Sequence, residues 1–219
     1  MQPIKWSFSG LKQYINCPHQ YNEVKVLKKY ETKPTHQMLY GTDVHSALEN
    51  YAKDGTALPH NYQRFAALVD PLLEIDGTRY PEHRMALRLD KSACAFDADD
   101  YWVRGIVDLM IITDDTAFIV DYKTGSDKYP DVKQLRLMAL MTFAHFPEVN
   151  NVKAGLMFVL RNNFIPEDYT RDQQDKLWGS FNGDIERMKM SYETGMWQKN
   201  PTPLCGWCPV NTCEHYRDR

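Results

Sequence analysis

Helical spacing marks the first third of the chain. In residues 37–53, apolar side chains recur every three or four positions, which places them on one face of a helix that ends near Gly55. This face carries Gly41, Val44, Leu48, Tyr51 and Ala52. His45 lies on the same stripe, so an ionisable group is expected beside the core. A further helical segment over residues 61–75 is predicted to break at Pro71.

Apolar runs then predict strands. Met85, Leu87 and Leu89 occupy alternate positions, which is typical of a half-buried strand. The runs at residues 101–112 and 117–123 are separated by the turn sequence TDDT. Two apolar runs joined by so short a turn predict an antiparallel hairpin.

The second half of the chain completes an α/β pattern. Residues 131–146 are apolar on most sides and predict a buried helix, and residues 152–160 predict an interior strand. A strand, a helix and a strand of this length form a crossover unit, so the strands over 117–123 and 152–160 should be parallel in a mixed sheet. A polar helix over residues 167–192 is expected next. Without repeats or long linkers, the chain is predicted to form one α/β domain over residues 1–219, with a mixed central sheet flanked by helices.

Composition and charge say little about the binding partners of the protein. The chain has 219 residues, and its 26 basic residues nearly balance its 29 acidic residues. Overall charge therefore predicts no nucleic-acid partner, and any phosphate must be bound by a local patch. No apolar run reaches the roughly 18 residues of a membrane span, and the first residues lack the apolar stretch of a signal peptide. We expect no membrane association and a cytoplasmic location.

The predicted hairpin carries a candidate metal site. Asp121 and Lys123 lie two residues apart on a strand and therefore share a face. Pairing of the hairpin arms brings Asp108 to the same end of the sheet. Two carboxylates there would repel each other unless a cation lay between them, and hard oxygen ligands suit Mg²⁺ or Mn²⁺. A nearby imidazole such as His45 favours Mn²⁺ somewhat.

Lys123 has two interpretations. Most lysines at strand ends simply reach solvent or form a surface salt bridge. Beside metal-bound carboxylates, however, its ammonium can hydrogen-bond an attacking water or a phosphate oxygen and stabilise charge in the transition state. This arrangement is the one that metal-assisted hydrolysis of a phosphodiester requires.

Four short motifs follow one another in a distinctive order: GTDVH at 41–45, GIVD at 105–108, DYKTG at 121–125, and Gln134 in the next helix. This set resembles the PD-(D/E)XK nuclease superfamily in its RecB-type branch. That branch includes the nuclease domains of bacterial recombination helicase-nucleases, CRISPR-associated adaptation exonucleases and many phage exonucleases. The resemblance implies a restriction-endonuclease-like core.

The resemblance also implies roles for individual residues. The metal ligands would be His45, Asp108, Asp121 and the main-chain carbonyl of Tyr122. Lys123 would be the catalytic lysine, and Gln134 would position the site or the DNA backbone. Many relatives carry a tyrosine four residues after that glutamine, where this chain has Met138. Glu82 stands where some relatives have an active-site acid, but we interpret it as a solvated loop glutamate.

Most cysteines lie near the two ends of the chain. A short helix is predicted over about residues 6–17, capped by Ser7 or Ser9, and it ends on Cys17. The tail, about residues 200–219, carries three thiols with metal-ligand spacing, Cys205, Cys208 and Cys213. The resemblance to iron-sulfur members of the branch makes Cys17 the fourth ligand of a structural [4Fe-4S] cluster. Such a cluster would clamp the N-terminal helix to the tail.

A zinc site is the alternative for the tail. Spacing alone also allows His215 to join the three C-terminal thiols around Zn²⁺. Reduced, buried thiols without metal are a third interpretation, which the C-x-x-C pair disfavours. Cys94 is alone in its segment and is expected to be a free thiol.

Together these features predict a Mg²⁺- or Mn²⁺-dependent DNA nuclease that acts as an exonuclease on single-stranded DNA ends. The alternatives are a nuclease for duplex ends or flaps, and a catalytically silent subunit that binds DNA ends. The sequence contains no helicase motif, so a helicase or recombination protein would have to unwind duplex DNA. If the chain is phage-encoded, it would act in the host cytoplasm. Local phosphate contacts could come from Lys128, Lys133, Arg136 and Arg161.

Overall fold

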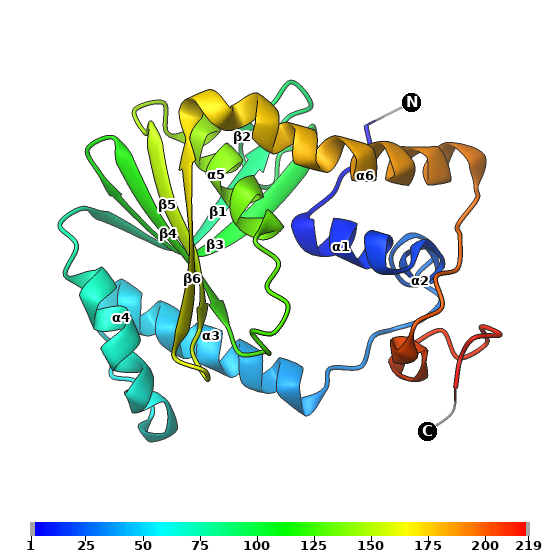
Figure 1. Ribbon diagram of the computed structural model, residues 1–219, viewed down its shortest axis with the longest axis horizontal. Coiled ribbons are helices and arrows are strands. Elements are labelled where there is room, and N and C mark those ends of the chain that lie inside the picture. Colours follow the sequence, from blue (N-terminus) through cyan, green and yellow to red (C-terminus); the bar gives the residue numbers. More distant parts are fainter. Residues whose placement is uncertain (1–2, 218–219) are drawn as a thin grey trace. The chain divides into compact units, whose positions relative to one another are not determined.

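The computed structural model describes residues 3–217, which fold as two compact units (Figure 1). The smaller unit combines the chain up to Thr35 with the chain from Gly179 onward, and the larger unit is His36–Trp178. The division falls inside the longest helix, α6 (Gln174–Thr194). The single domain over residues 1–219 stays a prediction. Within residues 3–217, no helix combines the length and apolar character needed to cross a membrane.

The larger unit is built on a six-stranded mixed sheet with the order β2-β1-β3-β4-β5-β6. The strands are β1 (Thr78–Leu87), β2 (Ala93–Cys94), β3 (Val103–Thr113), β4 (Thr116–Lys123), β5 (Asn151–Phe158) and β6 (Asn163–Thr170). Only β4 and β5 are parallel, and the helix α5 (Lys133–His145) connects them. The predicted hairpin, crossover unit and mixed sheet are confirmed.

Helices cover both faces of this sheet (Figure 1). On one face, α3 (His36–Asp54), the 3-10 helix η2 (His60–Phe65) and α4 (Ala66–Leu73) share a buried core with Leu109 and Ile111 of β3. Between those two residues, Met110 accepts a hydrogen bond from Thr142 of α5, with 3.6 Å between oxygen and sulfur. Successive strand residues point to opposite faces, so α5 covers the other side.

Three details of the sequence-based prediction are wrong. Pro71 lies inside α4, close to its end, where its missing N–H removes a hydrogen bond without stopping the helix. The strand predicted around Met85 begins earlier, at Thr78, and ends at Leu87, so Leu89 lies outside it and is exposed. Residues 163–170 form the edge strand β6, and the polar helix therefore begins only at Gln174.

The smaller unit consists of helices at both chain ends. They are α1 (Phe8–Asn16), α2 (Pro18–Tyr21), the π-helix η1 (Asn22–Val26), the part of α6 from Gly179, and the 3-10 helix η4 (Pro203–Trp207). Ser7 caps α1 by accepting a hydrogen bond from Gly10 N at 3.3 Å, which confirms the predicted N-terminal helix. Asn200 donates its side-chain amide to the carbonyl oxygen of Asn16 at 2.9 Å, so the tail is tied to the end of α1.

Candidate active site

Three side chains with metal-binding atoms converge in the larger unit. His45 of α3, Glu82 of β1 and Asp108 of β3 each offer one ligand atom, and these atoms all lie within 4.8 Å of one another. His45 Nδ1 lies 3.3 Å from Asp108 Oδ2. All three residues are half-buried, so the group combines a defined geometry with access from solvent. Within residues 3–217, no other three His, Cys, Asp or Glu side chains meet this closely.

Glu82 belongs to this group, so its interpretation as a solvated loop glutamate is wrong. It lies within β1 with φ of 46°, and no other non-glycine residue in a described strand has a positive φ. Tyr80 and His83 are three residues apart, yet both rings contact Phe146, at centroid distances of 5.3 and 5.7 Å. Strand side chains normally alternate between faces, so the alternation breaks where Glu82 lies. Such strained backbone costs about 1–3 kcal/mol and is typical of functional sites.

A second group of polar side chains lies at the end of β4. Asp121 and Lys123 share a face, as predicted, and their Oδ2 and Nζ atoms form an ion pair. Gln134, in the first turn of α5, donates from Nε2 to Asp121 Oδ1 at 2.6 Å. Its Oε1 accepts a hydrogen bond from Lys123 Nζ at 2.9 Å. One amide therefore fixes the position of both charged groups.

Asp108 connects the two groups. The regular β3–β4 ladder ends at the pairing of Leu109 with Val120, and beyond it Tyr122 N donates to Asp108 Oδ2 at 2.7 Å. The carboxylate thus replaces a strand partner at the point where the strands separate. Asp121 itself stays outside the set of ligand atoms within 4.8 Å, where it is held by Lys123 and Gln134.

Burial and crowding of the acids shift the ionisation of the site. Asp121 is only 2% exposed, and burial together with the nearby charge of Asp108 raises its pKa to about 6. Burial and the same neighbouring charge also raise the pKa of Glu82. Burial opposes protonation of His45, but its hydrogen bond to Asp108 and the charges of Asp108 and Asp121 outweigh burial and raise its pKa. Such crowded acids are stabilised by a cation, and their oxygen and imidazole donors fit Mg²⁺ or Mn²⁺.

The remaining residues singled out from the sequence lie close by or are buried. The ring of Tyr122 packs edge-on against His45 at a centroid distance of 6.1 Å. A Cβ at Gly41 would lie 3.1 Å from Thr124 Oγ1, so α3 passes close to the end of β4. Met138 is buried, with 4% exposure, and cannot replace a DNA-contacting tyrosine.

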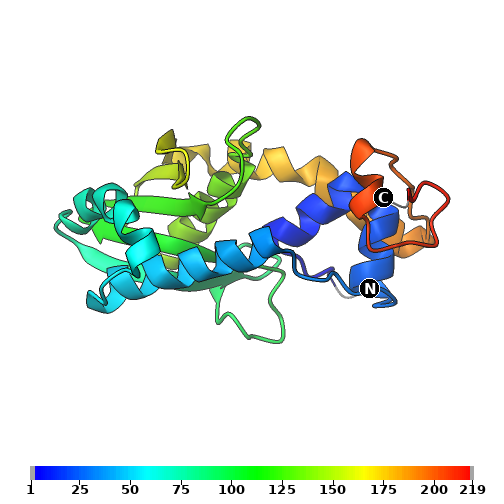
Figure 2. The same cartoon turned by 90° about the horizontal axis from the view of Figure 1, so that it is seen from below.

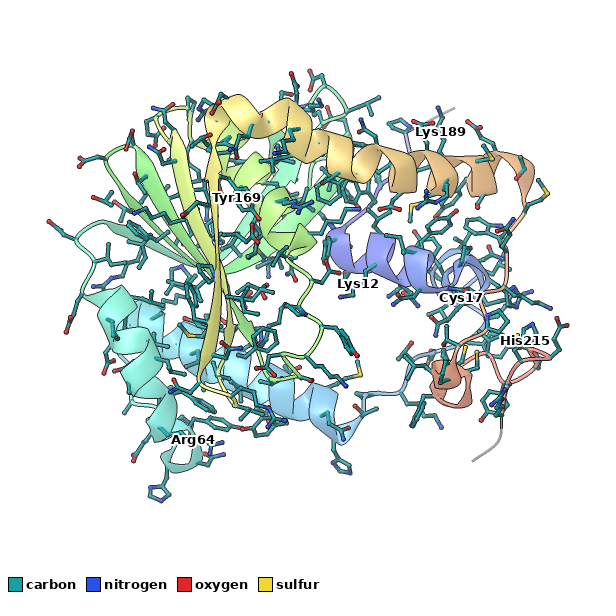
Figure 3. All side chains as sticks on the ribbon, in the orientation of Figure 1. Lys12, Cys17, Arg64, Tyr169, Lys189 and His215 are labelled. Atoms are coloured by element: carbon teal, nitrogen blue, oxygen red, sulfur yellow. The ribbon has the colours of Figure 1, made fainter. Side chains whose placement is uncertain are left out.

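The terminal cysteines lie in the smaller unit. Cys17, Cys205, Cys208 and Cys213 line one pocket, which His19 and His215 also border. Figure 3 labels Cys17 and His215 in this part of the chain. Among residues 3–217, no three cysteine sulfurs come within 4.8 Å of one another, so the thiols are less tightly gathered than the ligand atoms around Asp108. Cys94 belongs to β2 in the larger unit.

The fold and the site together define a class of protein. It is an α/β protein whose mixed sheet carries three residues with metal-binding atoms. Beside these residues lies a lysine that is paired with a buried aspartate. A family model for the PD-(D/E)XK nuclease superfamily matches residues 5–213. The chain therefore belongs to that superfamily, and this membership implies a hydrolase that acts on nucleic acid. The α/β fold predicted from the sequence is confirmed.

Two solved structures resemble the chain. A "putative exonuclease" from Eubacterium rectale is 12% identical, with 96% of this chain and 86% of that chain covered and a TM-score of 0.54. The protein SSO0001 is also 12% identical, with 99% of this chain and 89% of that chain covered and a TM-score of 0.48. At this identity the first likeness supports the fold alone. No curated protein matches the chain.

Proposed function

We propose that the protein is a metal-dependent deoxyribonuclease that hydrolyses phosphodiester bonds, acting as an exonuclease on single-stranded DNA ends. The observation that carries this proposal is the convergence of His45, Glu82 and Asp108 within 4.8 Å, close to the ion pair of Asp121 and Lys123. Nuclease superfamily membership and the sequence motifs of the RecB-type branch support it.

The site residues would have different roles in hydrolysis. His45, Glu82 and Asp108 would hold Mg²⁺ or Mn²⁺. The sequence motif adds Asp121 and the Tyr122 carbonyl as further ligands. When bound, such an ion lowers the pKa of water and polarises the phosphate. The Lys123 ammonium would hydrogen-bond the phosphate oxygens or the attacking water, where it stabilises the negative charge of the transition state.

Gln134 is a positioning residue in this scheme. It holds the Lys123 ammonium at 2.9 Å and the Asp121 carboxylate at 2.6 Å, and it is fixed itself by the first turn of α5. Preorganised charges need little reorganisation when the transition state forms. A silent DNA-end-binding subunit, the alternative from a different functional class, would need neither the lysine nor the amide that holds it.

The substrate preference is tested with linear and circular DNA. End-labelled single-stranded DNA, duplex DNA and covalently closed single-stranded circles are incubated with the protein and Mg²⁺ or Mn²⁺. We expect linear single strands to be degraded and closed circles to persist. Cutting of circles as fast as linear strands would replace the exonuclease by an endonuclease, and preferential cutting of duplex ends or flaps would select the other alternative. A helicase or recombination protein would supply single strands from duplex DNA.

We also propose that Cys17, Cys205, Cys208 and Cys213 hold a structural [4Fe-4S] cluster in the smaller unit. Four thiolates are the ligand set of such a cluster, and all four side chains line one pocket. A backbone hydrogen bond also connects the N-terminal helices to the tail, because His19 N donates to the carbonyl oxygen of Gln198 at 3.0 Å. The cluster would hold the two chain ends together and would take no part in hydrolysis.

Iron content tests this second proposal. Anaerobically purified protein should be brown and contain about four irons per chain. Cys17→Ser should lower the iron content and destabilise the protein, whereas the matched control Cys94→Ser, in β2, should keep its iron. A colourless protein with bound zinc that survives Cys17→Ser but not His215→Ala would support the zinc alternative.

A further inference from the structure

One stretch of the sheet presents arginines on the side away from α5. A Cβ at Gly105 of β3 would lie 3.2 Å from the Met141 sulfur of α5, so Gly105 faces that helix. Its immediate strand neighbours Arg104 and Ile106 therefore face the other way. Gly105 and Met110 both meet α5 although they are five residues apart, so the alternation of β3 breaks between them, opposite the break at Glu82 in β1. In the β1–β3 ladder, Arg84 pairs with Ile106 and Ala86 pairs with Arg104, which places both arginines on this surface. Arg84 and Ile106 are exposed.

Aromatic rings hold the two guanidinium groups. Arg84 and Arg104 lie over the same ring, that of Phe96, at 5.5 and 5.0 Å from its centroid. Arg104 also lies 4.8 Å from the centroid of Tyr101. Phe96 and Tyr101 belong to the loop between β2 and β3, which projects from the sheet in Figure 2. Stacking fixes the plane of a guanidinium but leaves its N–H groups free to donate.

The charge of Arg84 acts at longer range on the carboxylate of Glu82, but neither arginine is held in a close ion pair among the described residues. Within residues 3–217, neither Arg84 nor Arg104 has a carboxylate within ion-pair distance. Asp100, four residues before Arg104, is paired with Arg88 at 2.6 Å, and Asp108, four residues after it, is paired with His45 at 3.3 Å. Two like charges held over one ring repel each other, so an anionic partner between them would stabilise the arrangement.

The arginines also lie near the candidate metal group. Arg84 follows Glu82 by two residues along β1, and Arg104 precedes Asp108 by four residues along β3. At about 3.3 Å per residue, these separations are roughly 7 and 13 Å along the strands. Both distances are short enough for one bound strand to reach the arginines and the metal group.

We propose that Arg84 and Arg104, oriented by Phe96, bind backbone phosphates of the DNA strand whose scissile bond lies at the metal group. The proposal rests on the proposed nuclease function, and it assigns a path for the substrate on one side of the cut. A guanidinium can hold two phosphate oxygens at once, which suits a flexible single strand. Such contacts are independent of sequence, and Ile106 adds an apolar surface between the two charges.

The test separates binding from cleavage. In a Lys123→Ala background, binding of a labelled single-stranded oligonucleotide is measured by fluorescence anisotropy over a range of salt concentrations. Arg84→Gln and Arg104→Gln should each weaken binding roughly tenfold. Each substitution should also reduce the slope of log affinity against log salt concentration by about 0.7 in magnitude. This is the value for one phosphate contact of a single strand.

Two further variants distinguish specific contacts from general effects. Arg64→Gln is the matched control, because Arg64 is exposed and stacks on Phe65 at 5.1 Å, in η2 (Figure 3). It should leave affinity and salt dependence unchanged. Phe96→Leu keeps both charges but loses the ring, so affinity should fall while the salt dependence stays as in the parent. Thermal unfolding of every variant verifies that it is folded.

The outcomes separate this proposal from the proposed nuclease function. If the protein with Lys123 intact cuts DNA, but Arg84→Gln and Arg104→Gln bind as the Arg64→Gln control does, the arginine surface is wrong and the nuclease assignment stands. If that protein does not cut DNA, but the two substitutions weaken binding as expected, the binding surface stands and the nuclease assignment is wrong.

Discussion

In the metal-free protein, Asp121→Asn should raise stability although it alters a proposed metal ligand. Asp121 is 2% exposed, and burial and the charge of Asp108 raise the pKa of its carboxyl group from 3.8 to about 6. At roughly 1.4 kcal/mol per pKa unit, the ionised carboxylate destabilises the folded state by about 3 kcal/mol. A neutral amide avoids this term and can still accept the hydrogen bond from Gln134. It loses the ion pair with Lys123, whose ammonium keeps its hydrogen bond to Gln134 Oε1, so about 3 kcal/mol is the upper bound of the gain. For a chain of this length, the corresponding rise in melting temperature is roughly 6–12 °C.

The pH dependence follows from the direction of the shift. Because the folded-state pKa is above the ordinary value, the favourable contribution of Asp121 is fully present below about pH 4 and is lost as pH rises through about 6. The advantage of Asp121→Asn should therefore be largest above about pH 7 and should disappear near pH 4. Adding Mn²⁺ should stabilise the parent protein more than the variant, because the cation relieves the repulsion between the acids.

The assay is thermal unfolding in a chelator, repeated over this pH range and with Mn²⁺. Asp115→Asn is the control, since Asp115 is an exposed acid in the turn between β3 and β4. Its carboxylate accepts hydrogen bonds from Thr116 and Asn151, so its replacement should give no gain. If Asp121→Asn is no more stable than the parent protein at about pH 8, or if its advantage persists unchanged near pH 4, the ionised Asp121 carboxylate does not destabilise the fold.

Two further predictions concern the groups around the metal and the lysine. Glu82→Gln should weaken Mn²⁺ binding at least about tenfold, the scale reached even by groups that only orient ligands. Calorimetry measures this, and unchanged affinity would remove Glu82 from the ligand set. Gln134→Ala should lower the cleavage rate about 10–100-fold while Mn²⁺ and DNA affinities stay near those of the parent. An equal loss of DNA affinity would show that Gln134 contacts the substrate.

Regular periodicity made much of the fold predictable. The two-residue spacing of Asp121 and Lys123 is sufficient to place them on one face, because strand geometry is the same in every protein. The three- and four-residue spacing in α3 likewise identifies the buried positions Val44 and Leu48. The strand β6 could not be predicted from the sequence because it is an exposed edge strand with polar residues. The segment therefore lacks the apolar run by which a strand is recognised.

The candidate site was only partly predictable, because some of its geometry departs from local rules. Glu82 joins His45 and Asp108 through a positive φ inside a strand, and no spacing rule for strands anticipates such a break. Arg84 and Arg104 are 20 positions apart in the sequence, and only the register of the β1–β3 ladder brings them together. Both features depend on tertiary structure, which a single sequence does not encode in a local pattern.

Whether Asp108 and Lys123 belong to a hydrolytic metal site is tested by comparing cleavage and metal binding in the same protein preparations. The parent, Asp108→Ala and Lys123→Ala are assayed on end-labelled single-stranded DNA with Mn²⁺, and Mn²⁺ binding is measured by calorimetry. Lys153→Ala, which removes an exposed lysine from β5, is the control.

We expect both site variants to lose at least about 100-fold in cleavage rate, the usual cost of removing a group that stabilises transition-state charge. Lys123→Ala should keep Mn²⁺ affinity, Asp108→Ala should lose it, and the control should match the parent in both. Cleavage by Asp108→Ala or Lys123→Ala at near the parent rate would contradict the assignment of this site.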